Sequence, residues 1–336
     1  MDIVQHLVKT IGAKAFMNSA ISTLVIPESV TAIGNNAFQN AASLKKITLS
    51  KNLVTMGKAM FKNCSKLTSV VIPATVKNIP VDTFLNCTSL TKVNLGSVET
   101  IGKFAFKGCE KLIAVDLPVT LTELDPMSFY GCKSLEAVNV VDGNASFRSV
   151  EGVVISADED GNFNTIALYP AGKQGDYTVS DDIKNIADRA FYDCDNLEKV
   201  EFSGSLERIG TESFFDCDAL LTVTLPADAR SVGDYAFASC NELREFVVNS
   251  NLTEYSENVF DGCYYFNYDS VTINVTESSA VFIIVVVLIF VVVGVVWYFK
   301  YQKKQVKVEQ EIKEKIAERE LLEKAKKIKA EMAEKE

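Results

Sequence analysis

The chain has 336 residues, 48% hydrophobic and 23% charged, a composition typical of a folded protein. Its formal net charge of −10 argues against a nucleic-acid partner, because phosphate contacts need a concentrated cationic surface. His6 is the one histidine, and the sequence has no P-loop, nucleophile elbow or His-Glu-x-x-His motif. We therefore expect no enzymatic activity and no bound cofactor or metal.

The charge is distributed unevenly along the chain. Residues 1–140 carry 14 lysines and nine acidic residues, a net charge of about +5. Residues 141–279 carry eight basic and 26 acidic residues, about −18, and residues 300–336 carry about +3. Surfaces of opposite charge attract different partners, so the two halves are expected to face different environments.

A repeat of 22 or 23 residues organises the first 270 residues or so. Each copy begins with Ile-Gly-x-x-Ala-Phe, as at Ile11, and continues with Leu-x-x-Val-x-Leu, often closed by proline, as at Leu67 to Pro73. The alternation Val-x-Leu predicts a short strand, and copies stacked about 4.8 Å apart predict a parallel sheet along one side of a coil. A single copy would expose its apolar face, so the stack is the stable unit.

The full pattern, Ile-Gly-x-x-Ala-Phe-x-x-Cys-x-x-Leu-x-x-Val-x-Leu-Pro, resembles the leucine-rich repeats of BspA-like surface antigens. The resemblance extends over residues 3 to about 265. It implies a leucine-rich-repeat solenoid with a parallel β-sheet on one face and short turns or helices on the other. It also implies a surface protein with adhesive or host-contact roles, and no catalytic residue can be carried over.

The register of the repeat breaks once, between Val140 and Ile183, where strand-like runs separated by Gly and Asp indicate an enlarged repeat with one or two hairpins. The predicted organisation is leucine-rich repeats 1–6 over residues 1–140, an enlarged irregular repeat over 141–185, leucine-rich repeats 7–10 over 186–270, a juxtamembrane linker over 271–279, a transmembrane helix over 280–299 and a charged cytoplasmic helical tail over 300–336.

Eight cysteines share one repeat position: Cys64, Cys87, Cys109, Cys132, Cys194, Cys217, Cys240 and Cys263. Their spacing is not that of a zinc site. Neighbours one coil apart would be about 5 Å apart, within disulfide reach, but their parallel Cβ directions disfavour the bridge. Ser19 and Ala41 take this position in the first two copies. We expect a ladder of reduced, buried thiols, with disulfides as the alternative.

Residues 280–299 carry no charge, and twenty such residues suffice to cross about 30 Å of lipid hydrocarbon. Trp297 and Tyr298 lie where an interfacial aromatic belt is expected. Four lysines follow the span from Lys300 to Lys307, whereas no Lys or Arg lies between Arg244 and the span. This asymmetry predicts a single-pass plasma-membrane protein with the solenoid outside and the tail cytoplasmic.

No apolar segment of a secretory signal precedes the repeats, which fits the predicted topology poorly. An incomplete N-terminus, or a cytosolic solenoid on an internal membrane, are the alternatives. Glycosylation triplets that fit an extracellular solenoid begin at Asn144, Asn251 and Asn274.

The tail, residues 300–336, is rich in helix-forming residues and contains neither Gly nor Pro. Glu–Lys pairs four residues apart support a helix, and a short coiled-coil-like seam is formed by Leu321, Ala325, Ile328 and Met332. A solvated charged helix is the simplest interpretation. Self-association of the tail, or docking of a cytoplasmic adaptor, remains as an alternative.

In a leucine-rich coil, the residues between the buried strand positions face outward on the concave side. We predict ligand contacts there from Lys46, Thr48, Ser69, Lys92, Asn94, Asp116, Asn139, Lys199 and Glu201. The leading hypothesis is a surface protein that binds an extracellular protein or glycan, with the basic half meeting anionic host molecules and the acidic half standing off the cell's own negative surface. A receptor or sorting protein acting through its tail, and a passive coat protein or variable antigen, are the alternatives.

Overall fold

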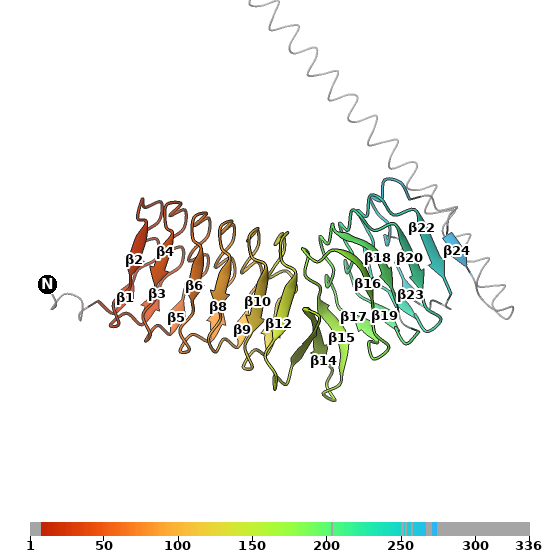
Figure 1. Ribbon diagram of the computed structural model, residues 1–336, viewed down its shortest axis with the longest axis horizontal. Coiled ribbons are helices and arrows are strands. Elements are labelled where there is room, and N and C mark those ends of the chain that lie inside the picture. Colours follow the sequence, from red (N-terminus) through yellow and green to blue (C-terminus); the bar gives the residue numbers. More distant parts are fainter. Residues whose placement is uncertain are drawn as a thin grey trace, which may run out of the picture. The chain divides into compact units, whose positions relative to one another are not determined.

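A computed structural model describes residues 8–202, 204–249, 252, 254–256, 258–266 and 271–273. The chain divides into two compact units, Met1–Glu277 and Ser278–Glu336, and every described residue belongs to the first. That unit is a parallel β-solenoid of the leucine-rich-repeat type, as the repeat predicts (Figure 1). The described ranges contain strands and turns but no helix. They therefore contain no helix with the length and apolar character needed to cross a membrane. The predicted transmembrane helix (280–299) and tail (300–336) lie outside the described residues.

One side of each coil is a strand of three to five residues with the Val-x-Leu alternation. In β4, Ile47 is buried while Lys46 and Thr48 are exposed, because successive side chains of a strand point to opposite faces. The strands pair in parallel in the orders β2-β4-β6-β8, β10-β12 and β16-β18-β20-β22-β24, and we call their outer surface the sheet face. Its strands are β2 (Thr23–Val25), β4 (Lys46–Thr48), β6 (Ser69–Val71), β8 (Lys92–Asn94), β10 (Ala114–Leu117), β12 (Ala137–Val140), β16 (Gly175–Thr178), β18 (Leu197–Glu201), β20 (Thr222–Leu225), β22 (Glu245–Val248) and β24 (Val271–Ile273).

A second ladder consists mainly of two-residue strands that end at the isoleucine of each Ile-Gly pair. These strands order as β1-β3-β5, β11-β9-β7 and β13-β14-β15-β17-β19-β21-β23. They are β1 (Thr10–Ile11), β3 (Ala32–Ile33), β5 (Thr55–Met56), β7 (Asn78–Ile79), β9 (Thr100–Ile101), β11 (Glu123–Leu124), β13 (Phe147–Val150), β14 (Val153–Ala157), β15 (Phe163–Leu168), β17 (Asn185–Ile186), β19 (Arg208–Ile209), β21 (Ser231–Val232) and β23 (Glu254–Tyr255).

A turn segment of six residues follows the second ladder in each regular coil, for example residues 35–40 and 58–63. In most coils its second and sixth residues have positive φ, as Asn36 and Asn40 do at 58° each. Asn, Asp and Gly tolerate this left-handed backbone best, which explains why they recur at the sixth position. We call the outer surface of these segments the turn face. The sequence predicted either turns or short helices on this side of the coil, and the structure has turns.

Phenylalanines from the turn segments fill the interior as a continuous stack. Ring centroids are 5.1–5.4 Å apart along Phe16, Phe38, Phe61, Phe84, Phe106 and Phe129. Beyond the irregular repeat the stack continues at 4.5–5.1 Å through Tyr169, Phe191, Phe214 and Phe237. Burying each ring contributes roughly 2–3 kcal/mol, and each stacked pair adds about 0.5–1.5 kcal/mol.

The irregular repeat contains two antiparallel pairings, β13 with β14 and β14 with β15, in the stretch where the sequence predicts hairpins. β15 then pairs in parallel with β17 and returns the chain to the ladder. Asn144 fixes the start of this insertion. Its Oδ1 accepts hydrogen bonds from the backbone N–H groups of Ser146 and Phe147, and its Nδ2 donates to the carbonyls of Pro118 and Leu121. Those four bonds satisfy the side-chain amide completely.

The sheet face extends further along the chain than the sequence boundary at residue 270. Residues 271–273, assigned to the juxtamembrane linker, form β24, which pairs in parallel with β22 through Phe246↔Val271 and Val248↔Ile273. The segment Val271-Thr272-Ile273 has the same alternation as the earlier strands. It was missed because no Leu-x-x precedes it, and the sheet face therefore includes residues 271–273.

The glycine of each Ile-Gly pair lets successive coils approach closely. A Cβ on Gly57 would lie 2.3 Å from the backbone nitrogen of Asn35 and 2.3 Å from the carbonyl carbon of Gly34. A Cβ on Gly12 would meet nothing within 4 Å. The glycine is therefore required where one coil's backbone rests on another's, and the reason is space rather than a positive φ.

We expect Gly57→Ala to lower the free energy of unfolding by about 3 kcal/mol, because backbone on both coils must move to admit the methyl group. Gly12→Ala, the matched control, should change stability by less than about 0.5 kcal/mol. Denaturant unfolding of the two variants beside the wild type measures the difference. Equal stabilities would show that the coils do not pack as closely as described.

Candidate functional site

All nine residues predicted to contact a ligand lie on strands of the sheet face, and all nine are exposed. On β4, β6 and β8 the parallel register aligns Lys46 with Ser69 and Ser69 with Lys92. At about 4.8 Å per coil, the two lysines are about 10 Å apart along this row. Neither makes an ion pair with a described residue. The first group of site residues is therefore a row of free positive charge.

The next row on the same strands is partly apolar. Thr48 aligns with Val25 of β2, and Asn94 aligns with Val71 of β6. The two valines are 71% and 65% exposed, which is unusual for large aliphatic side chains. Free lysines and exposed valines thus lie side by side at the start of the sheet face.

The other four predicted residues form two pairs. Asn139 on β12 donates from Nδ2 to Oδ1 of Asp116 on β10, at 3.0 Å. Lys199 and Glu201 lie on β18, beyond the irregular repeat, and their charged groups pair at 2.5 Å. Each shifts the other, since the Lys199 ammonium lowers the pKa of Glu201 and the Glu201 carboxylate raises the pKa of Lys199. Seven of the nine residues therefore lie on consecutive coils from β4 to β12, since β8 lies beside β10, whereas Lys199 and Glu201 lie apart on β18.

The predicted glycosylation position Asn144 is a structural residue. It is 7% exposed, and both hydrogens of its Nδ2 are used in hydrogen bonds to Pro118 and Leu121. A glycan on this nitrogen is incompatible with the folded irregular repeat, so the structure argues against Asn144 as an acceptor. Asn251 and Asn274 lie outside the described residues.

All eight cysteines are free and buried, as the packing interpretation predicts, and no disulfide joins them. Seven thiols donate to the carbonyl of the stacked phenylalanine one coil earlier, as Cys87 does to Phe61 at 3.1 Å. Burial raises the pKa of the Cys64 thiol to about 12 and that of Cys87 well above its ordinary value. These two thiols therefore stay protonated at neutral pH and are poor nucleophiles or metal ligands. No group of His, Cys, Asp or Glu in the described part of the chain could hold a metal ion.

The turn face carries an asparagine ladder that sequence reasoning missed. Asn40 donates from Nδ2 to Oδ1 of Asn18, Asn63 donates to Asn40, and Asn86 donates to Asn63, at 2.8–3.0 Å. An amide is both donor and acceptor, so identical amides can stack without conflict. The signal was visible in the sequence as asparagine recurring at the sixth position of the turn segment.

The same position holds aspartates in the second half of the solenoid, Asp193 and Asp216. Carboxylates cannot donate to one another when ionised. Burial raises the pKa of Asp216, and the neighbouring Asp218 and Asp195 raise it further. Burial also raises the pKa of Asp193, although the Lys133 ammonium opposes that shift. This part of the turn face therefore carries crowded negative charge.

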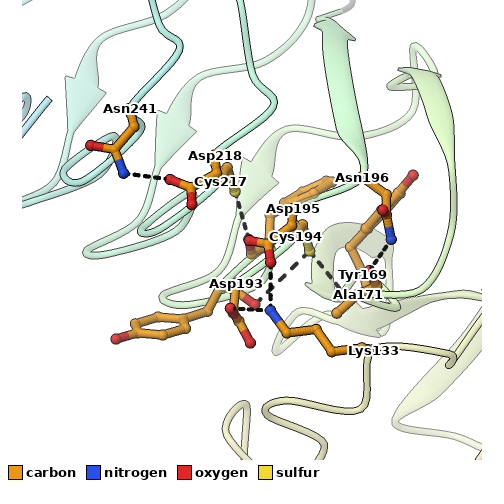
Figure 2. Close-up of polar contacts among 12 residues, drawn as sticks. Lys133, Tyr169, Ala171, Asp193, Cys194, Asp195, Asn196, Cys217, Asp218 and Asn241 are labelled. Atoms are coloured by element: carbon orange, nitrogen blue, oxygen red, sulfur yellow. Dashed lines mark hydrogen bonds and ion pairs between the residues drawn. The ribbon is translucent and has the colours of Figure 1, made fainter. Parts of the chain in front are cut away.

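Lys133 joins the two halves of the turn face across the irregular repeat. Figure 2 shows its Nζ between two carboxylates, 2.7 Å from Oδ1 of Asp193 and 2.6 Å from Oδ2 of Asp195. The Asp193 side chain is 8% exposed, whereas those of Lys133 and Asp195 are 45% and 38% exposed, so the contact is buried on the Asp193 side only. The partners are 60 and 62 residues apart in sequence, and no local pattern predicts such a contact.

Aromatic side chains line the turn face on both sides of this contact. Ring centroids are 6.4 Å apart from Phe104 to Tyr130, 5.3 Å from Tyr130 to Tyr192 and 5.0 Å from Tyr192 to Phe215. We call these four side chains the aromatic ridge, and all of them are partly exposed. Nζ of Lys107 lies 4.8 Å from the ring of Phe104 and 4.6 Å from that of Tyr130. Below the ridge, the irregular repeat passes through Tyr169 to Gly172 in place of a full turn segment, and a hollow beside it is lined by Pro126, Met127, Phe129, Tyr169, Pro170 and Ala190.

Coils of constant core and variable surface, stacked in parallel, define a leucine-rich-repeat solenoid, a fold typical of interaction scaffolds. The family model described as the BspA type leucine rich repeat region matches residues 9–144 and 167–281, and the chain belongs to this family.

Two solved structures show the same fold. A leucine rich cell surface protein from Faecalibacterium prausnitzii is 23% identical, with a TM-score of 0.54, and the match covers 81% of this chain and 84% of that one. The pneumococcal vaccine antigen PcpA is 23% identical, with a TM-score of 0.64, over 81% of this chain and 75% of that one. No curated protein matches the sequence.

We expect Lys133→Met to destabilise the solenoid by about 2 kcal/mol at neutral pH, because Asp193 would keep its buried charge without a cation. In the variant the pKa of Asp193 rises further above its value in the unfolded chain. The loss of folding stability is therefore complete at pH values above that raised pKa. It should disappear as the pH falls below about 4, where the carboxyl is protonated in folded and unfolded chains alike. Thermal unfolding from pH 3.5 to 7.5 measures the profile.

Lys111→Met is the matched control for this experiment. Lys111 is exposed and makes no ion pair with a described residue, so its replacement should leave stability within about 0.5 kcal/mol at every pH. A Lys133 variant that behaves like this control would rule out the contact as a stabilising one.

Proposed function

We propose that this protein is a cell-surface leucine-rich-repeat protein whose sheet face binds an extracellular protein or glycan. The observation that carries the proposal is the contrast between the two sides of each sheet-face strand. The inward positions Ile47, Val70 and Val93 are aliphatic in coil after coil, whereas the outward positions change from lysine to serine to lysine. Solubility requires only that the outward positions be polar. Specific binding also requires that their side chains differ from coil to coil.

The row of Lys46, Ser69 and Lys92 favours an anionic partner. Its lysines have no carboxylate partner among the described residues, and the exposed valines beside them offer apolar contact. A sulfated or sialylated glycan, or an acidic protein surface, supplies negative charge at comparable spacing. The two solved relatives are described as a cell surface protein and a vaccine antigen, and we propose a surface location for this chain as well.

The proposed anchor is a single transmembrane helix at residues 280–299, which holds the solenoid outside the plasma membrane and residues 300–336 in the cytoplasm. The support comes from the sequence: the span carries no charge, and lysines follow it but do not precede it. The acidic second half of the solenoid would then stand nearest the membrane, where the cell's own anionic surface repels it.

Cells that display the full chain should bind a fluorescent sulfated glycosaminoglycan about tenfold less tightly when they carry K46Q/K92Q, because two free charges leave the contact row. K14Q/K58Q removes two exposed lysines from the turn segments and should leave binding unchanged. Titration by flow cytometry measures both affinities. Unchanged binding in K46Q/K92Q would remove the sheet-face row from the proposal.

The topology is tested with epitope tags at the two ends of the chain and protease added to intact cells. We expect the N-terminal tag to be accessible and the C-terminal tag to be protected until the membrane is permeabilised, because the lysine asymmetry places the tail inside. A solenoid that resists protease and antibody on intact cells would contradict the surface location and direct the search to cytosolic partners.

A further inference from the structure

We infer that the turn face is a self-association surface, on which two copies of this chain pair antiparallel across the aromatic ridge, about a two-fold axis between Tyr130 and Tyr192. This surface is separate from the sheet face that is proposed to bind an external ligand. The inference rests on three features of the turn face: partly exposed aromatic rings, charges of opposite sign on either side of them that make no ion pair with a described residue, and the order of the coils.

The aromatic ridge supplies apolar area where it is least expected. The fifth position of the turn segment points outward, and elsewhere it holds Gln39, Lys62 or Asp261. Near the irregular repeat it holds Tyr130, Tyr192 and Phe215 in successive regular coils. Large aromatic side chains with a polar tip are enriched at protein interfaces, because they bury much area at a small cost in side-chain entropy.

Charges of opposite sign flank the ridge. On its first side Lys103 and Lys107 contact aromatic rings but no carboxylate among the described residues. On its second side Asp216 forms no ion pair with a described residue. Asp218 accepts a hydrogen bond from Nδ2 of Asn241 at 2.7 Å, as Figure 2 shows. The repulsion between the aspartates on the second side would be reduced by cationic side chains from another molecule.

The order of the coils makes the turn face complementary to itself. Counting outward from the proposed axis, Tyr130 and Tyr192 come first on the two sides. Lys103 and Lys107 lie one coil further on one side, and Asp216 and Asp218 one coil further on the other. A two-fold axis perpendicular to the stack therefore brings the lysines of each copy to the aspartates of its partner, twice.

The positions beyond this coil add little to the match. Next outward come Leu85 and Ala238, of which Ala238 is only 1% exposed, and then Asp261 and Lys62, whose Nζ already lies 3.1 Å from Oδ2 of Asp82. A parallel arrangement of two copies would instead bring lysines to lysines and aspartates to aspartates, which is repulsive. The charge pattern thus selects the antiparallel pair.

The test uses the full chain in detergent, in two differently tagged forms, and measures its mass by sedimentation velocity at low salt. Wild type should be dimeric. K103E/K107E and D216K/D218K each make both copies of the contact repulsive, so each should weaken dimerisation by about 100-fold or more. In a mixture of the two variants both contacts become attractive, and a heterodimer with wild-type affinity should form.

That mixture also shows that both variants are folded, because only folded surfaces can restore the contact. K46E/K92E, which reverses charge on the sheet face, should remain dimeric. A wild type that is monomeric at all concentrations would overturn the inference. So would a dimer insensitive to both variants, which would place association elsewhere in the chain, or a mixture of the two variants that stays monomeric.

Discussion

The spacing between coils is the constraint on which the rest of the molecule depends. Parallel strands must lie about 4.8 Å apart to share their hydrogen bonds, and every other part of the coil must fit that distance. Aromatic rings meet this requirement by stacking at 5.1–5.4 Å in the first half. Where backbone meets backbone only a hydrogen atom fits, which makes Gly57 obligatory, and thiols fit beside the rings because Cys87 and its equivalents donate to a carbonyl one coil away.

A fixed spacing also places equivalent residues of successive coils directly above one another. Whether such a row of identical side chains is stable depends on whether these side chains can bond to one another. Side-chain amides can bond to one another, because each is both a donor and an acceptor, and they form the asparagine ladder from Asn18 to Asn86. Ionised carboxylates cannot bond to one another in this way; burial raises the pKa values of Asp193 and Asp216, and neighbouring carboxylates raise them further. Lys133, on the coil before the insertion, offsets part of the repulsion between these carboxylates. Its ion pairs with Asp193 and Asp195 therefore stabilise the boundary between the two halves of the solenoid.

The sequence predicted the parts of the fold that repeat, because repetition turns a weak local pattern into a strong one. The coil, the buried Val-x-Leu strands, the reduced cysteine ladder and the outward direction of all nine site residues follow from period and alternation alone. The contacts of Lys133 and the hydrogen bonds of Asn144 did not follow, because each depends on how one insertion is folded. The spacing of the site residues did not follow either, since alternation gives the direction of Lys199 but not its distance from Lys92.

The irregular repeat affects the two faces differently. On the sheet face it separates β12 from β16, which belong to different sheets, so the free lysines of β4 and β8 lie on one array and the paired charges of β18 on another. On the turn face it contributes only the short passage through Tyr169, and Tyr130 contacts Tyr192 directly across it. An insertion that interrupts one surface while leaving the other continuous would allow the sheet face to vary with the proposed ligand. The turn face keeps the unbroken run of coils that a symmetric contact between two copies requires.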